Sequence, residues 1–148
     1  MKLIRSIIAG LLLLFVTQAS FAQWVGIASS QDRGGYDVYL DPNSKTQVDE
    51  GMTFWLLFDF KTLQQYAESV FLSYEIELEI NCLKQQGRIL GFVDFLEPMG
   101  RGQPNRISFV PQNWVSLSSA GKDELIWSLA CEGSPIAFVR GWSIANTK

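Results

Sequence analysis

The stretch Tyr74-Glu-Ile-Glu-Leu-Glu-Ile-Asn-Cys82 alternates strictly between apolar and polar residues. A period of two over this length is typical of a β-strand with one buried face and one solvated face. The apolar residues share a face with Cys82, whereas Glu75, Glu77 and Glu79 lie on the other face. We therefore predict a strand from Tyr74 to Cys82 whose cysteine sulfur points into the core.

The N-terminus predicts export. Lys2 and Arg5 precede an apolar run from Ile7 to Val16, and Ser20-Phe21-Ala22 places small residues where a signal peptidase reads them. We expect residues 1–22 to be a signal peptide that is removed before Gln23; the alternative is an uncleaved amphipathic anchor. The run is too short to span a bilayer comfortably, and no later segment is long and apolar enough to do so.

The mature chain, residues 23–148, has 126 residues, a length that predicts one domain with its own core. Without Lys2 and Arg5 it holds 10 cationic residues against 15 carboxylates, a net charge of −5. This charge argues against nucleic acids and anionic membrane surfaces as partners, because both bind cationic patches. Two cysteines and no histidine offer no plausible metal ligand set, and we expect no cofactor.

The second cysteine, Cys131, lies near the end of a helix-like segment from Lys122 to Glu132, which Ser118 and Ser119 precede as N-cap residues. Two cysteines in an exported chain are typical of one disulfide. A bond between Cys82 and Cys131 would fasten the helix to the inner face of the sheet. The loop that it closes, of about fifty residues, corresponds to a stabilisation on the order of 4 kcal/mol. Two free buried thiols are the alternative.

The remaining periodicity predicts an α+β fold with about six strands. The segment from Met52 to Phe60 is apolar on both faces, which favours a central strand that is covered on each side. Lys61 to Glu68 is expected to be a polar connection, and Arg88 is expected to lie opposite the glutamates of the neighbouring strand. The other expected strands are Trp24–Ser30, Tyr36–Leu40, Arg88–Leu96 and Arg106–Val110, with a further strand-like segment at Ile136–Trp142.

The residues favour no enzymatic site. Without histidine, the usual general base and the triads built on it are missing. Asp41, Asp59 and Asp94 are candidates for a carboxylate acid–base pair, but each lies where an aspartate commonly caps a turn or ends a strand. The three glutamates of the Tyr74–Cys82 strand are interpreted as a solvated face that discourages aggregation. The alternative is that they bind a cation or a basic protein surface.

Protein contacts are the remaining possibility that the residues suggest. Phe138 and Trp142, in the C-terminal tail, are candidates for exposed aromatic contacts; packing onto an edge strand is the alternative. Arg101 and Arg106, in and beside the loop from Glu97 to Asn105, complete the set of candidate protein-binding residues. The tryptophans expected in the core are Trp24, Trp55, Trp114 and Trp127.

An ordered set of short motifs runs through the chain: Trp24-Val, Val38-Tyr-Leu-Asp41-Pro with Ser44, Phe54 to Asp59, Ser73, Cys82, Arg88-Ile-Leu, Met99-Gly100, Trp114-Val and Cys131. This set resembles the surface-adhesin protein E family of small exported Gram-negative domains. The resemblance implies an antiparallel sheet of about six strands, with the C-terminal helix bound to its concave face by the disulfide. It also implies a surface or periplasmic protein that binds host matrix or serum proteins.

We therefore expect an exported, non-catalytic binding module in the periplasm or on the surface of a Gram-negative bacterium. Its expected partner is a host or envelope protein, or a second copy of this chain. The alternative function is that of a periplasmic protein that binds a small ligand or lipid on the concave face, which would require an open apolar cavity there. A carboxylate-dependent hydrolase that uses Asp41, Asp59 or Asp94 is the third hypothesis.

Overall fold

The computed structural model describes residues 23–132 together with the backbone of residues 142 and 143. The predicted signal peptide, residues 1–22, lies outside the described residues, as does Phe138. Within the described part of the chain, no helix is both long enough and apolar enough to cross a membrane.

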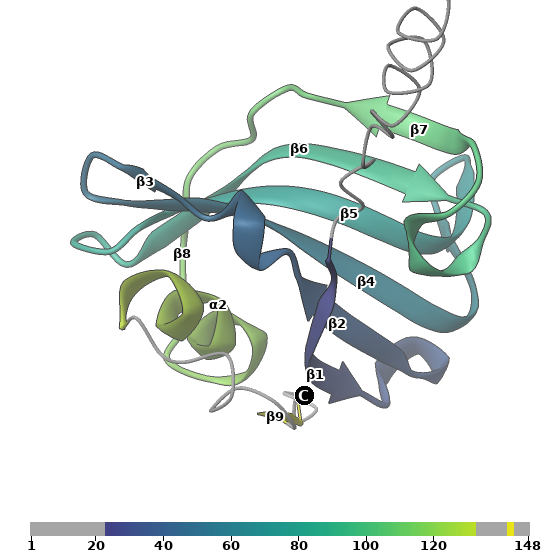
Figure 1. The fold of residues 1–148 in the computed structure, drawn as a ribbon, viewed down its shortest axis with the longest axis horizontal. Coiled ribbons are helices and arrows are strands. Elements are labelled where there is room, and N and C mark those ends of the chain that lie inside the picture. The colour runs from purple at the N-terminus through teal and green to yellow at the C-terminus, as the bar shows by residue number, and fades with distance from the viewer. Residues whose placement is uncertain (1–22, 133–141, 144–148) are drawn as a thin grey trace, which may run out of the picture.

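The described residues form one mostly antiparallel sheet of nine strands, and the predicted α+β class is confirmed (Figure 1). The order across the sheet is β7-β6-β5-β4-β2-β1-β9; β3 also pairs with β4, and β8 with β6. The pairing of β9 with β1 is parallel. The strands are β1 Val25–Ser30, β2 Tyr36–Leu40, β3 Thr46–Val48, β4 Gly51–Tyr66, β5 Ser69–Asn81, β6 Gln86–Phe95, β7 Pro104–Ser108, β8 Val115–Ser116 and β9 Trp142–Ser143.

Strand β5 has the two faces that the alternation predicts. Ile76, Leu78 and Ile80 are buried on the concave face, where they belong to the main hydrophobic core. Glu77 and Glu79 are half-buried on the convex face. Arg88 of β6 lies opposite Glu79 and forms an ion pair with it at 2.6 Å, as the sequence predicts.

Strand β4 lies between β2 and β5, which confirms the central position predicted for its apolar run. The prediction of a polar connection from Lys61 to Glu68 is wrong, because β4 continues to Tyr66. After a register shift, Gln64, Gln65 and Tyr66 pair with the first residues of β5. Most residues of this extension are exposed, so their polarity reflects contact with solvent and not the end of the strand.

The sheet has more strands than the six predicted because β3, β8 and β9 are only two or three residues long. Segments of that length are too short to show a periodicity of two. Three 3-10 turns also join the strands: η2 Asp32–Gly34, η3 Pro42–Ser44 and η4 Pro98–Gly100.

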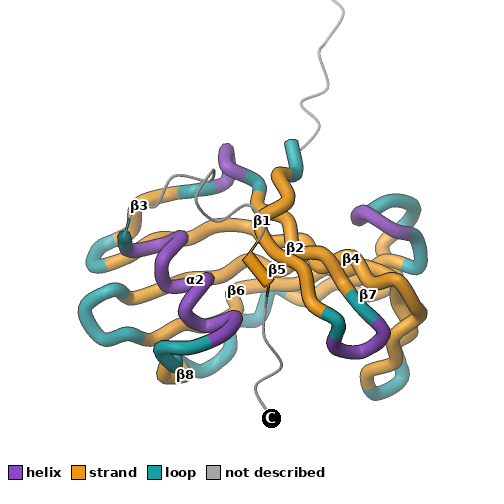
Figure 2. The backbone as a smooth tube through the Cα atoms, turned by 90° about the horizontal axis from the view of Figure 1, so that it is seen from below, coloured by secondary structure: helices purple, strands orange, loops and turns teal. Residues whose placement is uncertain are grey.

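Helix α2, Gly121–Cys131, covers part of the concave face (Figures 1 and 2). Leu125 and Leu129 of the helix are almost fully buried in the core. The disulfide between Cys82 and Cys131 is present, with Cα atoms 5.6 Å apart. The Lys45 ammonium donates a hydrogen bond of 2.7 Å to the Leu129 carbonyl near the C-terminal end of the helix. These contacts hold the C-terminal half of α2 against the sheet.

The start of α2 differs from the prediction of a serine N-cap. Ala120 is the N-cap residue, and its side chain makes no capping hydrogen bond. Ser118 instead donates from its backbone N–H and its hydroxyl to the Asp123 carboxylate, both at 3.1 Å. The serine therefore fixes the first turn through an acidic side chain of that turn, a contact that spacing alone did not distinguish from a cap.

Turn η4 forms the cover on the convex face of β4 and β5. The backbone N–H of Met99 donates to the Asp59 carboxylate at 2.7 Å, and that of Gly100 donates to the Ser73 hydroxyl at 3.0 Å. Leu57 of β4 has no exposed surface even though it points to the convex side, because this turn lies over it. Both faces of β4 are therefore covered, by α2 and by η4.

Candidate functional site

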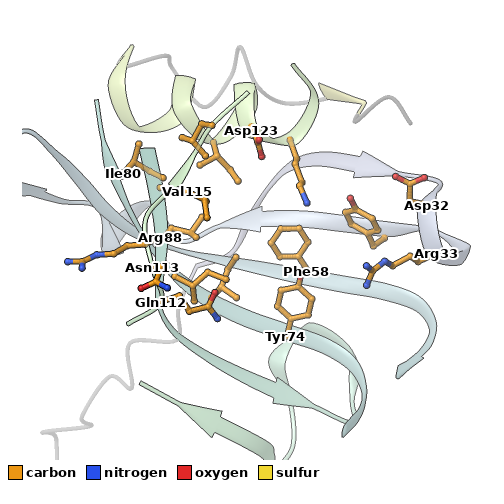
Figure 3. Close-up of a pocket in the computed structure, with 18 of the residues that line it drawn as sticks. Asp32, Arg33, Phe58, Tyr74, Ile80, Arg88, Gln112, Asn113, Val115 and Asp123 are labelled. Carbon is orange, nitrogen blue, oxygen red and sulfur yellow. The ribbon is translucent and has the colours of Figure 1, made fainter. Parts of the chain in front are cut away.

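An open cavity of about 610 Å³ lies on the concave face, between the sheet, turn η2 and the N-terminal half of α2 (Figure 3). Its floor is aromatic, because β2, β4 and β5 each place rings there. The rings of Phe58 and Tyr74 stack with centroids 4.8 Å apart, and the ring centroids of Tyr36 and Phe60 are 5.2 Å apart. Aliphatic residues of β5, β6 and α2, including Ile76, extend this apolar lining.

Two tyrosine hydroxyls are the polar groups of this aromatic floor. Neither Tyr36 nor Tyr74 makes a side-chain hydrogen bond to another described residue. Burial raises the pKa of Tyr74 well above its ordinary value of 10.0, and nearby Tyr36 contributes to the increase. The raised pKa keeps the Tyr74 phenol protonated near neutral pH, and the hydroxyls of both tyrosines can donate hydrogen bonds.

Charged residues stand at the rim of the cavity. Arg33 lies close enough to Tyr74 to favour its ionised form, and Figure 3 shows its guanidinium directed towards Phe58 and Tyr74. Lys122, in the first turn of α2, also lines the cavity. Neither Arg33 nor Lys122 forms an ion pair with a described residue. The rim therefore carries two cations whose charges no carboxylate contacts directly within the described ranges.

The backbone of η2 fixes the position of Arg33. Its φ of 53° is in the left-handed region, which non-glycine residues seldom adopt. The side-chain amide of Gln64 donates a hydrogen bond of 3.0 Å to the Arg33 carbonyl, which ties this conformation to β4. The polar extension of β4 thus has a structural role: it holds the turn that presents Arg33.

A second candidate site is an exposed apolar surface along β7 and the segment after it, here called the edge patch. Its members are Ile107, Phe109, Val110 and Trp114, and the exposed fractions of the first three are 54, 60 and 74%. β7 is the last strand of the sheet order, so among the described strands its outer edge has no partner. The edge patch therefore combines apolar side chains with open backbone hydrogen-bonding groups.

Phe109 is held in the edge patch by a glycine of the neighbouring strand. Its ring lies over Gly91, where any larger side chain would collide with it. The same ring meets Trp55 edge-to-face, with centroids 6.4 Å apart. More than half of Phe109 still faces solvent. The patch is therefore an ordered surface whose aromatic ring has a fixed orientation.

The family model of surface-adhesin protein E matches residues 24–132. The chain belongs to the surface-adhesin protein E family. No curated protein matches it.

One solved structure shows the same fold, and a second is similar at a lower TM-score. The structure of crystal form II of Haemophilus influenzae protein E is similar with a TM-score of 0.52 and 12% identity, over 62% of this chain and 77% of that chain. Protein E from non-typeable Haemophilus influenzae gives a TM-score of 0.48 and 15% identity, over 68% of this chain and 69% of that one.

In this adhesin-family chain, the residues predicted to bind protein do not come together. Arg101 is exposed beside η4, and Arg106 forms an ion pair of 3.0 Å with buried Asp94 at the β7 side of the sheet. The backbone of Trp142 lies in β9, at the opposite end of the strand order, where it pairs with Ala28. Arg106 immediately precedes Ile107 of the edge patch, and Trp142 belongs to another edge.

The prediction that Trp114 is a core residue is wrong. Its side chain is 37% exposed and lies beneath the guanidinium of Arg88, which is 4.5 Å from the ring centroid. The sequence reasoning missed the edge patch because it assigned apolar residues to the core. The signal was present in Phe109-Val110, which stands directly before Pro111-Gln-Asn and therefore between strands. Trp24, Trp55 and Trp127 are half-buried.

The three candidate carboxylates have structural partners and do not form an acid–base pair. Asp59 and Asp94 point to opposite faces of the sheet, since their registers match Ser73 and Tyr74, which are consecutive residues of β5. Asp41 accepts a hydrogen bond of 3.0 Å from the backbone N–H of Asn43 and caps η3. Within the described ranges, no group of three or more histidines, cysteines or carboxylates could hold a metal ion.

Proposed function

We propose that this protein is an exported, non-catalytic binding module that contacts host or envelope proteins through the edge patch. The observation that carries the proposal is the set of exposed apolar side chains on an unpartnered strand edge. Contiguous exposed apolar surface marks interaction sites on soluble proteins. The membership of the chain in an adhesin family supports a binding role over an enzymatic one.

The edge patch is suited to an extended segment of a partner protein. An open strand edge binds such a segment by backbone hydrogen bonds, while alternate side chains contact neighbouring pockets. Ile107 and Phe109 lie on one face of the edge, and Arg106 lies on the other. Tryptophan and arginine are among the residues that most often dominate binding energy at interfaces; Trp114 lies in the patch, and Arg106 is next to Ile107 in the chain.

The test compares two variants of the mature protein. The double variant Ile107→Thr/Val110→Thr removes apolar surface but keeps β-branched side chains. The control Leu63→Thr makes a similar change at a residue of β4 that is 61% exposed. The immobilised wild type is exposed to purified extracellular-matrix and serum proteins. We expect the double variant to lose about tenfold in affinity for a protein that binds, a change of about 1.4 kcal/mol, and the control to match the wild type. Equal affinities of wild type and double variant would contradict the proposed surface.

The proposed location has its own test. A C-terminally tagged chain is expressed in a Gram-negative host, and protease is added to intact cells. Loss of the tag from unbroken cells would place the domain outside, where it can meet host proteins. Survival of the tag until the outer membrane is opened would restrict the partners to envelope proteins.

A second function is favoured by the cavity on the concave face. The sequence-based alternative of a small-ligand or lipid-binding protein required an open apolar cavity at this place. A volume of about 610 Å³ is within the range of ligand pockets, and an apolar lining with a few polar groups is typical of them. We propose ligand binding in this cavity as a function separate from protein binding at the edge patch.

A further inference from the structure

Four polar groups around the aromatic floor of the cavity can donate hydrogen bonds. Arg33 and Lys122 can only donate, and the hydroxyls of Tyr36 and Tyr74 can also donate. Neither tyrosine hydroxyl has a side-chain hydrogen-bond partner among the described residues, and neither is a buried unpartnered atom, so both are open to a ligand in the cavity. The complementary group is therefore an acceptor, and the two cations favour an acceptor that carries negative charge.

The acidic side chains at the rim of the cavity either accept hydrogen bonds from the protein or point away from the aromatic floor. Asp123 accepts two hydrogen bonds from Ser118, both at its Oδ2 oxygen. Asp32 is directed away from Phe58 and Tyr74, whereas Arg33 points towards them (Figure 3). At the other end of the cavity the guanidinium of Arg88 is paired with Glu79. The cations left to meet a ligand on the aromatic floor are Arg33 and Lys122.

A path of apolar side chains runs through the rest of the lining, beside the polar side chains of Arg88, Gln112 and Asn113. From the aromatic floor it continues along β5 and β6 to β8 and the inner side of α2. The residues that form this path are Ile76, Leu78, Ile80, Ile89, Leu117 and Ile126. Such a path fits a flexible hydrocarbon chain better than a compact polar molecule, because every added methylene finds apolar surface.

We infer that the cavity binds a single-chain fatty carboxylate, with its head group at Arg33, Lys122 and the two tyrosine hydroxyls and its chain along the aliphatic path. This inference rests on the proposed binding of a small ligand in the cavity and names the chemical class of that ligand. A carboxylate has two oxygens, so it can accept from the guanidinium and a phenol at once.

The test is a titration of the full mature protein with dodecanoate and with dodecanol, both below the concentration at which they aggregate. We expect saturable binding of dodecanoate at one site, weaker binding of dodecanol, and an affinity that rises about threefold to fourfold per added methylene. Arg33→Gln, Lys122→Gln and Tyr74→Phe should each weaken dodecanoate about tenfold and leave dodecanol unchanged. Lys84→Gln removes the same charge from an exposed turn outside the cavity and should change neither affinity.

The outcomes separate the inference from the function on which it rests. Equal affinities for the two ligands, insensitive to Arg33→Gln and Lys122→Gln, would overturn the carboxylate head group and leave small-ligand binding standing. Binding of neither ligand, or uptake that does not saturate, would overturn both. A tenfold loss for Lys84→Gln as well would mean that general charge attraction, and not this site, governs binding.

Discussion

Different structural elements cover the two faces of β5, although successive residues of this strand point alternately to one face and to the other. On the concave face an amphipathic helix, held by a disulfide, buries Leu78 and Ile80 but leaves an open cavity over Tyr74. On the convex face a short turn is fixed by hydrogen bonds to Asp59 and Ser73. The comparison shows that alternation identifies the apolar face of a strand, but the cover determines how much of that face stays available to a ligand.

The largest expected effect comes from removing the tether of the concave cover. Cys82→Ser/Cys131→Ser should lower the free energy of unfolding by about 4 kcal/mol, because the unfolded chain gains the freedom of the closed loop. Urea unfolding of the oxidised parent and the variant measures this difference. The reduced parent serves as the control and should unfold with the variant. Equal midpoints for parent and variant would show that the tether does not stabilise the fold.

Two adjacent positions of β5 test the contrast between the faces directly. Leu78→Ala should lower the free energy of unfolding by about 3 kcal/mol, since it leaves a cavity in the core on the concave face. Glu77→Ala, one residue earlier and half-buried on the convex face, should change stability by no more than about 0.5 kcal/mol. Chemical denaturation of both variants gives the comparison. Similar losses would mean that the convex face is packed as tightly as the concave one.

A substitution at Asp59 tests the hydrogen bond that holds turn η4 on the convex face. Asp59→Ala removes the acceptor of the Met99 N–H. It should lower the free energy of unfolding by about 2 kcal/mol, a value typical of hydrogen bonds to charged groups. Limited trypsin digestion should then cut faster at Arg101. Asp37→Ala is the matched control, because Asp37 forms an exposed ion pair with Lys61 that contributes less than about 1 kcal/mol. Unchanged cleavage at Arg101 in Asp59→Ala would show that the turn is held by other contacts.

The smallest expected effect is a pH dependence on the convex face. Burial, with a contribution from Asp41, raises the pKa of Glu75 above its ordinary value of 4.5. The folded state therefore binds this proton more tightly than the unfolded state, so stability falls as pH rises from the ordinary pKa through the folded one.

Glu75→Gln should consequently stabilise the protein near pH 7, and this gain should disappear below about pH 4, where the carboxyl is protonated in both states. Thermal unfolding of parent and variant at the two pH values measures the change. Glu77→Gln makes the same substitution two positions along the same face and is the matched control. A gain for Glu75→Gln that persists in acid would assign the effect to packing instead of to charge.

Local pattern was sufficient for much of the fold. The alternation of apolar and polar residues located β5, and the run that is apolar on both faces placed Met52–Phe60 at the centre of the sheet. The bond between Cys82 and Cys131 was predicted because Cys82 shares a strand face with the apolar residues and the chain has two cysteines. These predictions succeed because each pattern reflects burial at the residue itself. The extension of β4 to Tyr66 could not be found in this way, since its exposed polar residues look like a connection.

The candidate sites were harder to predict because they depend on contacts between distant segments. Arg33 reaches the cavity through a left-handed turn held by Gln64, a residue 31 positions later. Trp114 and Phe109 are residue types that are common in protein cores. Both are exposed because they lie at the edge of the sheet, on the side of β7. Arg101 and Arg106 were singled out by charge, yet no local pattern indicates that Arg106 is paired with Asp94.

The bond between Cys82 and Cys131 also divides the chain into a covalent ring and a remainder. Turn η4 and the segment that carries Phe109 lie inside the ring, whereas the turn between β4 and β5 lies outside it. A protease that cuts after Arg101 therefore leaves two fragments that are still one molecule, with the helix joined to β5. A cut after Ala67 would leave fragments that only packing holds together. The segments before and after β7 are thus the places where an exported protein can be nicked and survive.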